Sequence, residues 1–137
     1  MARRSTQRRD AVFALYQSDL TGRGLDDLLG RSSSEYTRAL AHATEDRSDE
    51  LDELIGRHAE GWTVDRIAPL ERAILRTALL EMLHPELVPA ESPIPPEGAI
   101  NEAVELAKTF AGADAPGFVN GILAAVLREM SETPRER

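Results

Sequence analysis

Apolar residues recur at three- and four-residue steps along most of this chain, which is the spacing of one buried face on an amphipathic α-helix. The stripe within 70–83 is the widest of them, so this segment is expected to be the central helix of a bundle. The pattern and its breaks predict these helices and helical turns: 4–20, 26–29, 34–44, around 51–58, 64–68, 70–83, around 100–110, and 116 to about 130.

Several residue types mark where these helices begin and end. Gly22 follows the first helix, because glycine is the usual residue beyond a helix end. The hydroxyl of Ser32, three residues before Glu35, has the spacing of a capping box for the next long helix. Pro69 suits the first position of the central helix. Five prolines within 85–96 predict a stiff extended linker that is neither a helix nor the interior of a sheet.

The composition fits one all-α domain. The chain has 137 residues, enough for one compact core, and its hydrophobic (42%) and charged (29%) shares are those of an ordinary globular protein. Aromatic residues make up only 4%, so the core must consist of Leu, Ile, Val and Ala, which pack readily between helices. Cysteine is absent, and no apolar run is long enough for a membrane span or an export signal. We therefore expect a soluble, cytoplasmic protein.

The net charge of −8 argues against nucleic-acid binding when it is taken alone, because a phosphate backbone repels an acidic protein. The charge is unevenly distributed, however. Residues 1–9 hold four arginines and no acid, a charge of +4, whereas residues 44–60 hold seven acids and two arginines, a charge of −5. A basic arm on an acidic body is a recurring arrangement in proteins that contact RNA or DNA.

The four arginines of this arm allow two interpretations. Guanidinium groups grip phosphates bidentately, so Arg3, Arg4, Arg8 and Arg9 are candidate RNA contacts. Alternatively, they form a solvated basic terminus that has no ligand. Phe118, near the start of the last helix, likewise has two interpretations, because its ring can stack on an unpaired base or fill the core.

Catalytic and metal-binding motifs are missing from the sequence. His42, His58 and His84 are 16 and 26 residues apart, so no two of them share a helical face, and no cysteine is available to complete a zinc site. The serines lack the sequence context of a nucleophile, and there is no glycine-rich phosphate loop. We predict that the protein is not an enzyme and that it has no catalytic residue, no metal ligand and no cofactor.

Four sequence blocks carry a resemblance that spans nearly the whole chain. The two most specific are INEAVELAKTF at 100–110 and FVNGIL at 118–123, and the others are RRDAVFALY at 8–16 and ERAILR at 71–76. In this order the blocks closely resemble the NusB family of bacterial transcription antitermination factors. The resemblance implies an all-α fold of two small antiparallel helical bundles, packed into one compact domain of about seven helices.

The implied domain organisation is a single NusB-like helical domain over residues 1–137. Its N-terminal bundle would cover about 1–62 and its C-terminal bundle about 63–131, with a frayed tail over 132–137. Gly121, inside the last helix, is interpreted structurally, because a glycine there usually marks a close approach of another helix.

The resemblance also implies a function. Family members bind the boxA element in the leader RNA of ribosomal RNA operons, and they do so with NusE, which is also a protein of the small ribosomal subunit. The pair joins the RNA polymerase elongation complex with other Nus factors, and the polymerase then resists termination. By position, Arg8 corresponds to a family arginine at the RNA surface, and Arg3 and Arg4 lie in the same arm.

Two further pairs of residues are carried over by position. Asp114 and Phe118 match the loop and helix start that meet RNA, and Glu71 and Arg76 fall in the helix that lies against NusE. The arm departs from the family pattern, because residues 5–7 interrupt what is often a continuous arginine run. The arginines that touch phosphate are therefore not identified by position alone.

Two alternatives from other functional classes stay open. One is a helical protein-binding adaptor with weak or no RNA affinity, which the net charge of −8 and the interrupted arm favour. The other is the helper domain of an RNA methyltransferase, since a related domain is found fused to such enzymes, but the sequence holds no methyl-donor motif. An exposed partner-binding face could also pair with itself, so monomer and homodimer both stay open.

Overall fold

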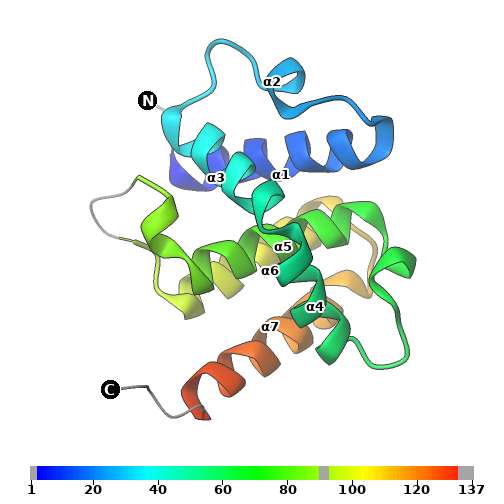
Figure 1. The fold of residues 1–137 in the computed structure, drawn as a ribbon. Helices are drawn as coiled ribbons and strands as arrows, with labels where there is room; N and C mark the ends of the chain where they lie inside the picture. Colours follow the sequence, from blue (N-terminus) through cyan, green and yellow to red (C-terminus); the bar gives the residue numbers. More distant parts are fainter. Residues whose placement is uncertain (1–2, 90–92, 133–137) are drawn as a thin grey trace.

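The computed structural model describes residues 3–89 and 93–132, and within them the regular structure is entirely helical (Figure 1). This confirms the prediction of an all-α fold with about seven α-helices. Two single turns of 3₁₀-helix, η1 and η2, complete the set. In chain order the elements are α1 (Arg4–Thr21), α2 (Leu25–Leu28), α3 (Glu35–Asp46), α4 (Ser48–His58), η1 (Val64–Arg66), α5 (Pro69–Leu83), η2 (Pro85–Leu87), α6 (Pro96–Phe110) and α7 (Ala115–Glu132).

Helix α5 is the centre of the fold, as its wide apolar stripe predicts. It contacts α1, α3, α4, α6 and α7, and it lies in the middle of the molecule in Figure 1. Leu75, Leu79 and Leu80 on this helix are completely buried, and burying each such side chain stabilises the fold by roughly 1.5–3 kcal/mol. Because α5 packs against helices from both halves of the chain, it belongs to both sides of the core. The division into two bundles stays a prediction.

Local signals set most helix boundaries correctly. Gly22 ends α1 with a φ of 75°, and its N–H donates to the carbonyl of Ser18, which is the usual left-handed ending. The prediction that Ser32 caps α3 is wrong, however. Ser34, not Ser32, precedes the helix, and its Oγ accepts the Thr37 N–H at 3.0 Å. Since Glu35 is then the first helical residue, it cannot reach back as a capping box requires.

The proline-rich connection is partly helical, which corrects the prediction of a fully extended linker. Pro85 starts η2, because a proline at the first position of a helical turn loses no hydrogen bond. Val88 then turns inwards and is buried, and α6 begins at Pro96. Residues 90–92 lie outside the described residues. At the other end α7 includes Glu132, the first residue of the predicted frayed tail over 132–137, and residues 133–137 lie outside the described residues.

Gly121 does not mark a close helix approach, which contradicts the structural interpretation. A Cβ built on this residue would meet nothing within 4 Å, and the same holds for Gly117 one turn earlier. Both glycines line an open groove between α7 and the end of α4. Among the described residues, no helix combines the length and the apolar character needed to cross a membrane.

Candidate nucleic-acid interface

Three of the four predicted arm arginines lie on the surface where α1 begins. Arg3 precedes the helix and Arg4 is its first residue, and both are exposed, while the side chain of Arg9 is 42% exposed. We call these three residues the exposed arm. The guanidinium of Arg4 lies 4.2 Å from the centre of the Tyr36 ring and donates to Gln7 at 2.6 Å. The first turn of α1 contains no acidic residue that would neutralise the arm.

Arg8 is not part of this surface. Its side chain is buried and makes two hydrogen bonds to the Glu81 carboxylate, from Nε to Oε1 at 2.7 Å and from Nη2 to Oε2 at 3.1 Å. A second carboxylate, that of Glu102, lies 3.5 Å from Nη1. Of the four arginines predicted as RNA contacts, three therefore lie on the surface and Arg8 does not. The phosphate contact that the resemblance implies for Arg8 would require this ion pair to open, and RNA binding by an Arg8 variant decides between that contact and a purely structural role.

The Glu81 carboxylate joins side chains from three helices. Besides Arg8 from α1, it accepts a short hydrogen bond from the hydroxyl of Tyr36 on α3. Burial raises the pKa of Tyr36 above its ordinary value, and the hydrogen bond to Glu81 raises it further. Burial alone would lower the pKa of Arg8, but the hydrogen bond and the charge of Glu81 raise it. The network therefore keeps Tyr36 neutral and Arg8 charged, and it fixes the start of α1 onto α5.

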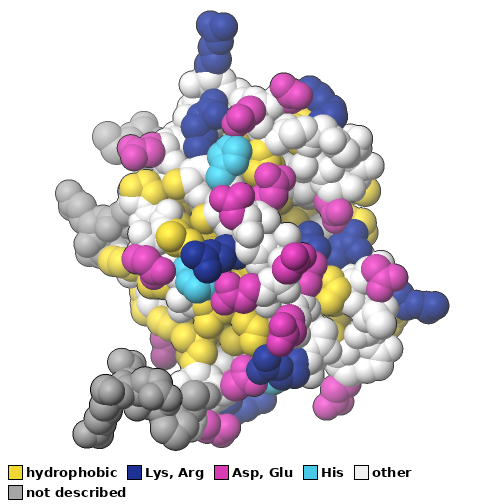
Figure 2. Space-filling view, in the orientation of Figure 1, with side chains coloured by type: hydrophobic (Ala, Val, Ile, Leu, Met, Phe, Trp, Pro, Cys, Tyr) yellow, Lys and Arg dark blue, Asp and Glu magenta, His cyan; other side chains and the backbone are white. Residues whose placement is uncertain are grey.

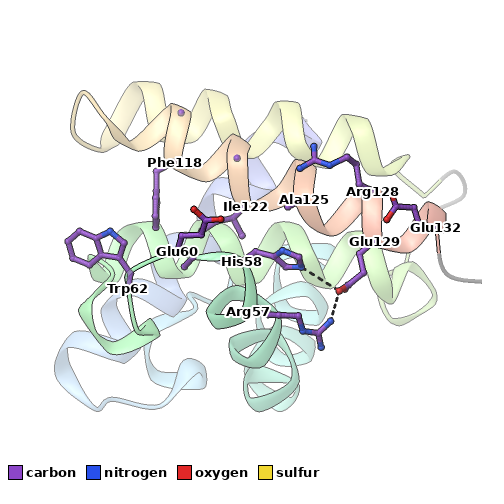
Figure 3. Close-up of a pocket in the computed structure, with 13 residues that line it drawn as sticks. Arg57, His58, Glu60, Trp62, Phe118, Ile122, Ala125, Arg128, Glu129 and Glu132 are labelled. Carbon is purple, nitrogen blue, oxygen red and sulfur yellow. Dashed lines mark hydrogen bonds and ion pairs between the residues drawn. The ribbon is translucent and has the colours of Figure 1, made fainter.

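Three other predicted site residues meet at the opposite end of α5. Asp114, Phe118 and Glu71 line one groove of about 470 Å³, which we call the aromatic groove, together with Trp62 and Arg66. A second groove of about 690 Å³ continues from it between α7 and the end of α4. Trp62 and Phe118 line both grooves, and Figure 3 shows the two rings projecting into the same end of the second one.

Local backbone structure holds the two aromatic rings in place. Gly61 has a φ of 77°, and the Trp62 N–H donates to the carbonyl of Ala59 at 2.9 Å, which makes a tight turn after α4. This turn leaves Trp62 52% exposed. On the other side, the Phe118 N–H donates to the carbonyl of Asp114 at the start of α7. Phe118 is half-buried and packs partly against the core, so both predicted roles of its ring stay open.

Trp62 and Arg66 are the site residues that sequence reasoning missed. A signal was present, because Trp62 is the one tryptophan of the chain, stands directly after a glycine and belongs to no apolar helical stripe. A large ring without a stripe has no core position assigned to it and is expected at the surface. Arg66 follows one turn later and is exposed.

The two predicted partner-binding residues do not share a site. Glu71 is half-buried in the aromatic groove, and this burial raises the pKa of its carboxyl group. Arg76, five residues later, turns to another side of α5. There it makes two hydrogen bonds to Asp52 of α4, at 2.7 and 2.8 Å. Burial alone would lower the pKa of Arg76, but the bonds to Asp52 raise it, so this guanidinium stays charged and ties α5 to α4.

The predicted RNA contacts therefore form two groups at opposite ends of α5. At one end of α5, Glu81 binds Arg8 of the arginine-rich start of α1. At the other end, Glu71 lines the aromatic groove. Ten helical residues separate Glu71 from Glu81, which corresponds to about 15 Å along the helix axis. Figure 1 shows the same separation, because α1 begins on the left, where α5 ends, and the α6–α7 turn lies on the right. Between them, acidic and basic side chains are interspersed on the face shown in Figure 2.

Oppositely charged side chains of the second groove pair with each other. Arg57 donates to Glu129 at 2.5 Å, and His58 lies 3.6 Å from the same carboxylate oxygen (Figure 3). The hydrogen bond from Arg57 lowers the pKa of Glu129. In the part of the chain that the structure describes, no group of three or more histidine, aspartate or glutamate side chains could hold a metal ion.

Comparisons with known proteins agree on one family. The NusB family model matches residues 5–128 of this chain. The chain is 43% identical to the transcription antitermination protein NusB of Rubrobacter xylanophilus over 126 residues, which cover 88% of this chain and 86% of that protein. Its fold is similar to that of T. maritima NusB, with a TM-score of 0.80, 28% identity, and coverage of 93% of this chain and 92% of that one.

A second solved structure contains RNA. A chain in the crystal structure of the antitermination factors NusB and NusE in complex with dsRNA is similar to this chain, with a TM-score of 0.76 and 26% identity. The match covers 92% of this chain and 96% of that one, so the two are alike over nearly their whole length.

Proposed function

Because this chain belongs to the NusB family of transcription antitermination factors, we propose that it binds boxA-type leader RNA of ribosomal RNA operons together with NusE. In this function it joins the RNA polymerase elongation complex with other Nus factors and helps the polymerase to resist termination. It acts by binding and not by catalysis, and its place of action is the cytoplasm, where bacterial transcription takes place.

The exposed arm is the observation that carries the RNA-binding part of this proposal. None of its three arginines takes part in the buried Arg8–Glu81 ion pair, although the Arg4 guanidinium lies over the Tyr36 ring, and the first turn of α1 holds no acid. Among the described residues the arm makes one ion pair, from Arg9 to the adjacent Asp10 at 3.6 Å, and this pair is exposed and therefore weak. Phosphates can replace such a partner readily, so the arm supplies sequence-independent affinity.

The aromatic groove supplies the second contact. Phe118 offers a half-exposed ring on which an unpaired base can stack, and Asp114 places a carboxylate beside it. Arm and groove together let one RNA strand contact the protein at both ends of α5. Contacts to phosphate position an RNA, whereas contacts to bases distinguish its sequence, so the two groups have different tasks.

NusE is the proposed protein partner, and the similarity to the NusB–NusE complex supports it. Glu71 and Arg76 remain the proposed contact residues on α5. Arg76 already donates a hydrogen bond to Asp52, so NusE would contact Arg76 and Asp52 together, as an ion pair. Glu71 lies in the aromatic groove, so a partner that covers Glu71 would also lie next to the RNA.

A second candidate function is a protein-binding adaptor with weak RNA affinity. The observation that favours it is the internal pairing of Arg8, which removes one guanidinium from the arm of a protein whose net charge is −8. Binding of a labelled boxA-type RNA and of a scrambled RNA, each with and without NusE, separates the two functions. The proposal requires preference for boxA that NusE strengthens, whereas NusE binding without any RNA binding would establish the adaptor.

Sedimentation of the free protein, with and without NusE, tests the remaining partner hypothesis, a homodimer. If the NusE-binding surface also pairs with itself, the free protein sediments as a dimer and becomes monomeric within the NusE complex. A single monomeric species at all concentrations would remove the homodimer from the proposal.

Phe118→Ala separates the two roles of that ring. If the ring stacks on a base, RNA affinity should fall by about 1–3 kcal/mol while NusE binding is kept. If the ring belongs to the core, unfolding should become easier by about 3–5 kcal/mol, and RNA binding should be normal wherever the protein is folded. Thermal melting and RNA titration of the same variant distinguish these outcomes.

A further inference from the structure

Trp62 is a large aromatic side chain that the fold leaves in solvent. Its side chain is 52% exposed, although aromatic side chains are scarce in this chain and one of them, Tyr36, is fully buried. The ring is not on a loose segment, because the αL glycine Gly61 and the hydrogen bond to Ala59 hold its backbone in a defined turn. An exposed ring on a rigid turn loses little conformational entropy when a ligand covers it.

The space beside Trp62 is open and faces a second ring. Trp62 and Phe118 line the same two grooves, but no ring contact joins them within the described part of the chain. Gly112 lines the aromatic groove and Gly117 directly precedes Phe118, and a Cβ built on either would meet nothing within 4 Å. A flat ligand can therefore approach both rings without displacing a side chain at these positions.

The chemistry of the groove favours an RNA base over a protein segment. A partner helix needs several large exposed aliphatic anchors, but the two large aliphatic residues of the grooves, Ile67 and Ile122, are themselves buried. Besides small side chains such as those of Ala68 and Ala113, the two rings are the apolar groups that these grooves present to solvent. Arg66 lies in the same groove as Trp62, is exposed, and interacts electrostatically with the adjacent Asp65. Two rings and an adjacent exposed guanidinium are the parts of a single-strand binding site.

We propose that Trp62 is a second stacking platform beside Phe118, which holds an unpaired base of the bound RNA, and that Arg66 contacts the phosphate next to this base. This inference rests on the proposed RNA-binding function and adds two residues to it. The aromatic groove then holds two neighbouring nucleotides, one on each ring, rather than one.

The test uses the fluorescence of Trp62, which is the only tryptophan of the chain and so reports on this site alone. The wild-type protein is titrated with single-stranded boxA-type RNA, and the same mixture is followed by anisotropy of a label on the RNA. N-acetyltryptophanamide with the same RNA corrects for light absorption by the RNA. Stacking should quench Trp62, and quenching should saturate together with the anisotropy.

Two substitutions separate stacking from general apolar contact. Trp62→Leu keeps an apolar side chain but has no π face, and it should weaken RNA binding by about 5- to 150-fold. Trp62→Phe keeps a ring and should retain most of the affinity. Leu20→Ala is the matched control, since Leu20 is 55% exposed on α1 and lines neither groove, and it should bind RNA as the wild type does. Circular dichroism checks that the variants fold.

Each outcome decides a different hypothesis. RNA binding without quenching of Trp62, together with normal binding by Trp62→Leu, would overturn the inference and leave the proposed function in place. Quenching by NusE alone, with none by RNA, would also overturn it and make Trp62 a protein contact. The absence of RNA binding by the wild type under all conditions would refute the proposed function itself, and this inference with it.

Discussion

Replacing Glu81 by glutamine tests whether the buried network at the start of α1 is a structural element. The substitution keeps the size of the side chain and removes its charge. Arg8 would then remain buried, with its side chain only 10% exposed, while its two strong hydrogen bonds to a carboxylate are lost. The nearest remaining negative charge is Glu102, which lies 3.5 Å from Nη1 and is itself one-third exposed.

The expected cost follows from this geometry. Breaking a buried ion pair by removing one partner destabilises a protein by about 3–5 kcal/mol, because the other charge is left without compensation. Since Glu102 retains part of the interaction, we expect a loss near the lower end, about 3 kcal/mol. A domain of this length is stable by roughly 7–20 kcal/mol, so the variant should still fold. Its melting temperature should fall by roughly 10 °C.

The assay is denaturant unfolding of a double-mutant cycle. Arg8→Met and Glu81→Leu alone should each destabilise the protein, but the double variant should lose less than the sum, because it leaves no unpaired charge. RNA binding of Arg8→Met, measured where the variant is folded, should equal that of the wild type. The reasoning is refuted if Glu81→Gln has normal stability, or if Arg8→Met keeps its stability but loses RNA affinity.

Three further predictions concern the exposed arm, two glycines and one carboxyl group. Replacing the exposed arm with alanines should lower the salt slope of RNA binding by about 2 and leave the melting temperature unchanged. Gly61→Ala should cost about 1–2 kcal/mol in denaturant unfolding, because its φ is 77°, whereas Gly121→Ala should stabilise α7 by about 0.5–1 kcal/mol, since its Cβ meets nothing. Because burial raises the pKa of Glu71, ionisation opposes folding, so Glu71→Gln should stabilise the protein at neutral pH, and this gain should vanish below about pH 4.

Much of the fold could be predicted because its signals are local. The start of α5 at Pro69 and the end of α1 at Gly22 depend on residues whose backbone preferences act at their own positions. The cap of α3 shows the limit of this reasoning. Three serines precede the helix, and only the geometry of the turn decides that Ser34 is the one whose hydroxyl reaches Thr37.

The site was harder to predict because it depends on contacts between distant residues. Arg8 and Glu81 are 73 residues apart, so nothing in the arginine-rich start of the chain shows that one of its four guanidiniums is neutralised inside the fold. The interpretation of Gly121 as a close helix approach was wrong for a related reason. A glycine within a helix is compatible with a close neighbour or with open space, and only the packing of α7 shows that the space is open.

The central helix gives these two contact groups a fixed separation. Because α5 is anchored at one end by Glu81 and reaches the aromatic groove with Glu71 at the other, the arm and the groove cannot approach each other without breaking the core. One continuous strand that contacts the arm therefore presents its next nucleotides to the groove at high effective concentration, whereas two short RNAs gain no such advantage. It follows that salt should weaken boxA-type and scrambled RNA alike through the arm, while the difference between the two RNAs should depend on the groove and persist at high salt.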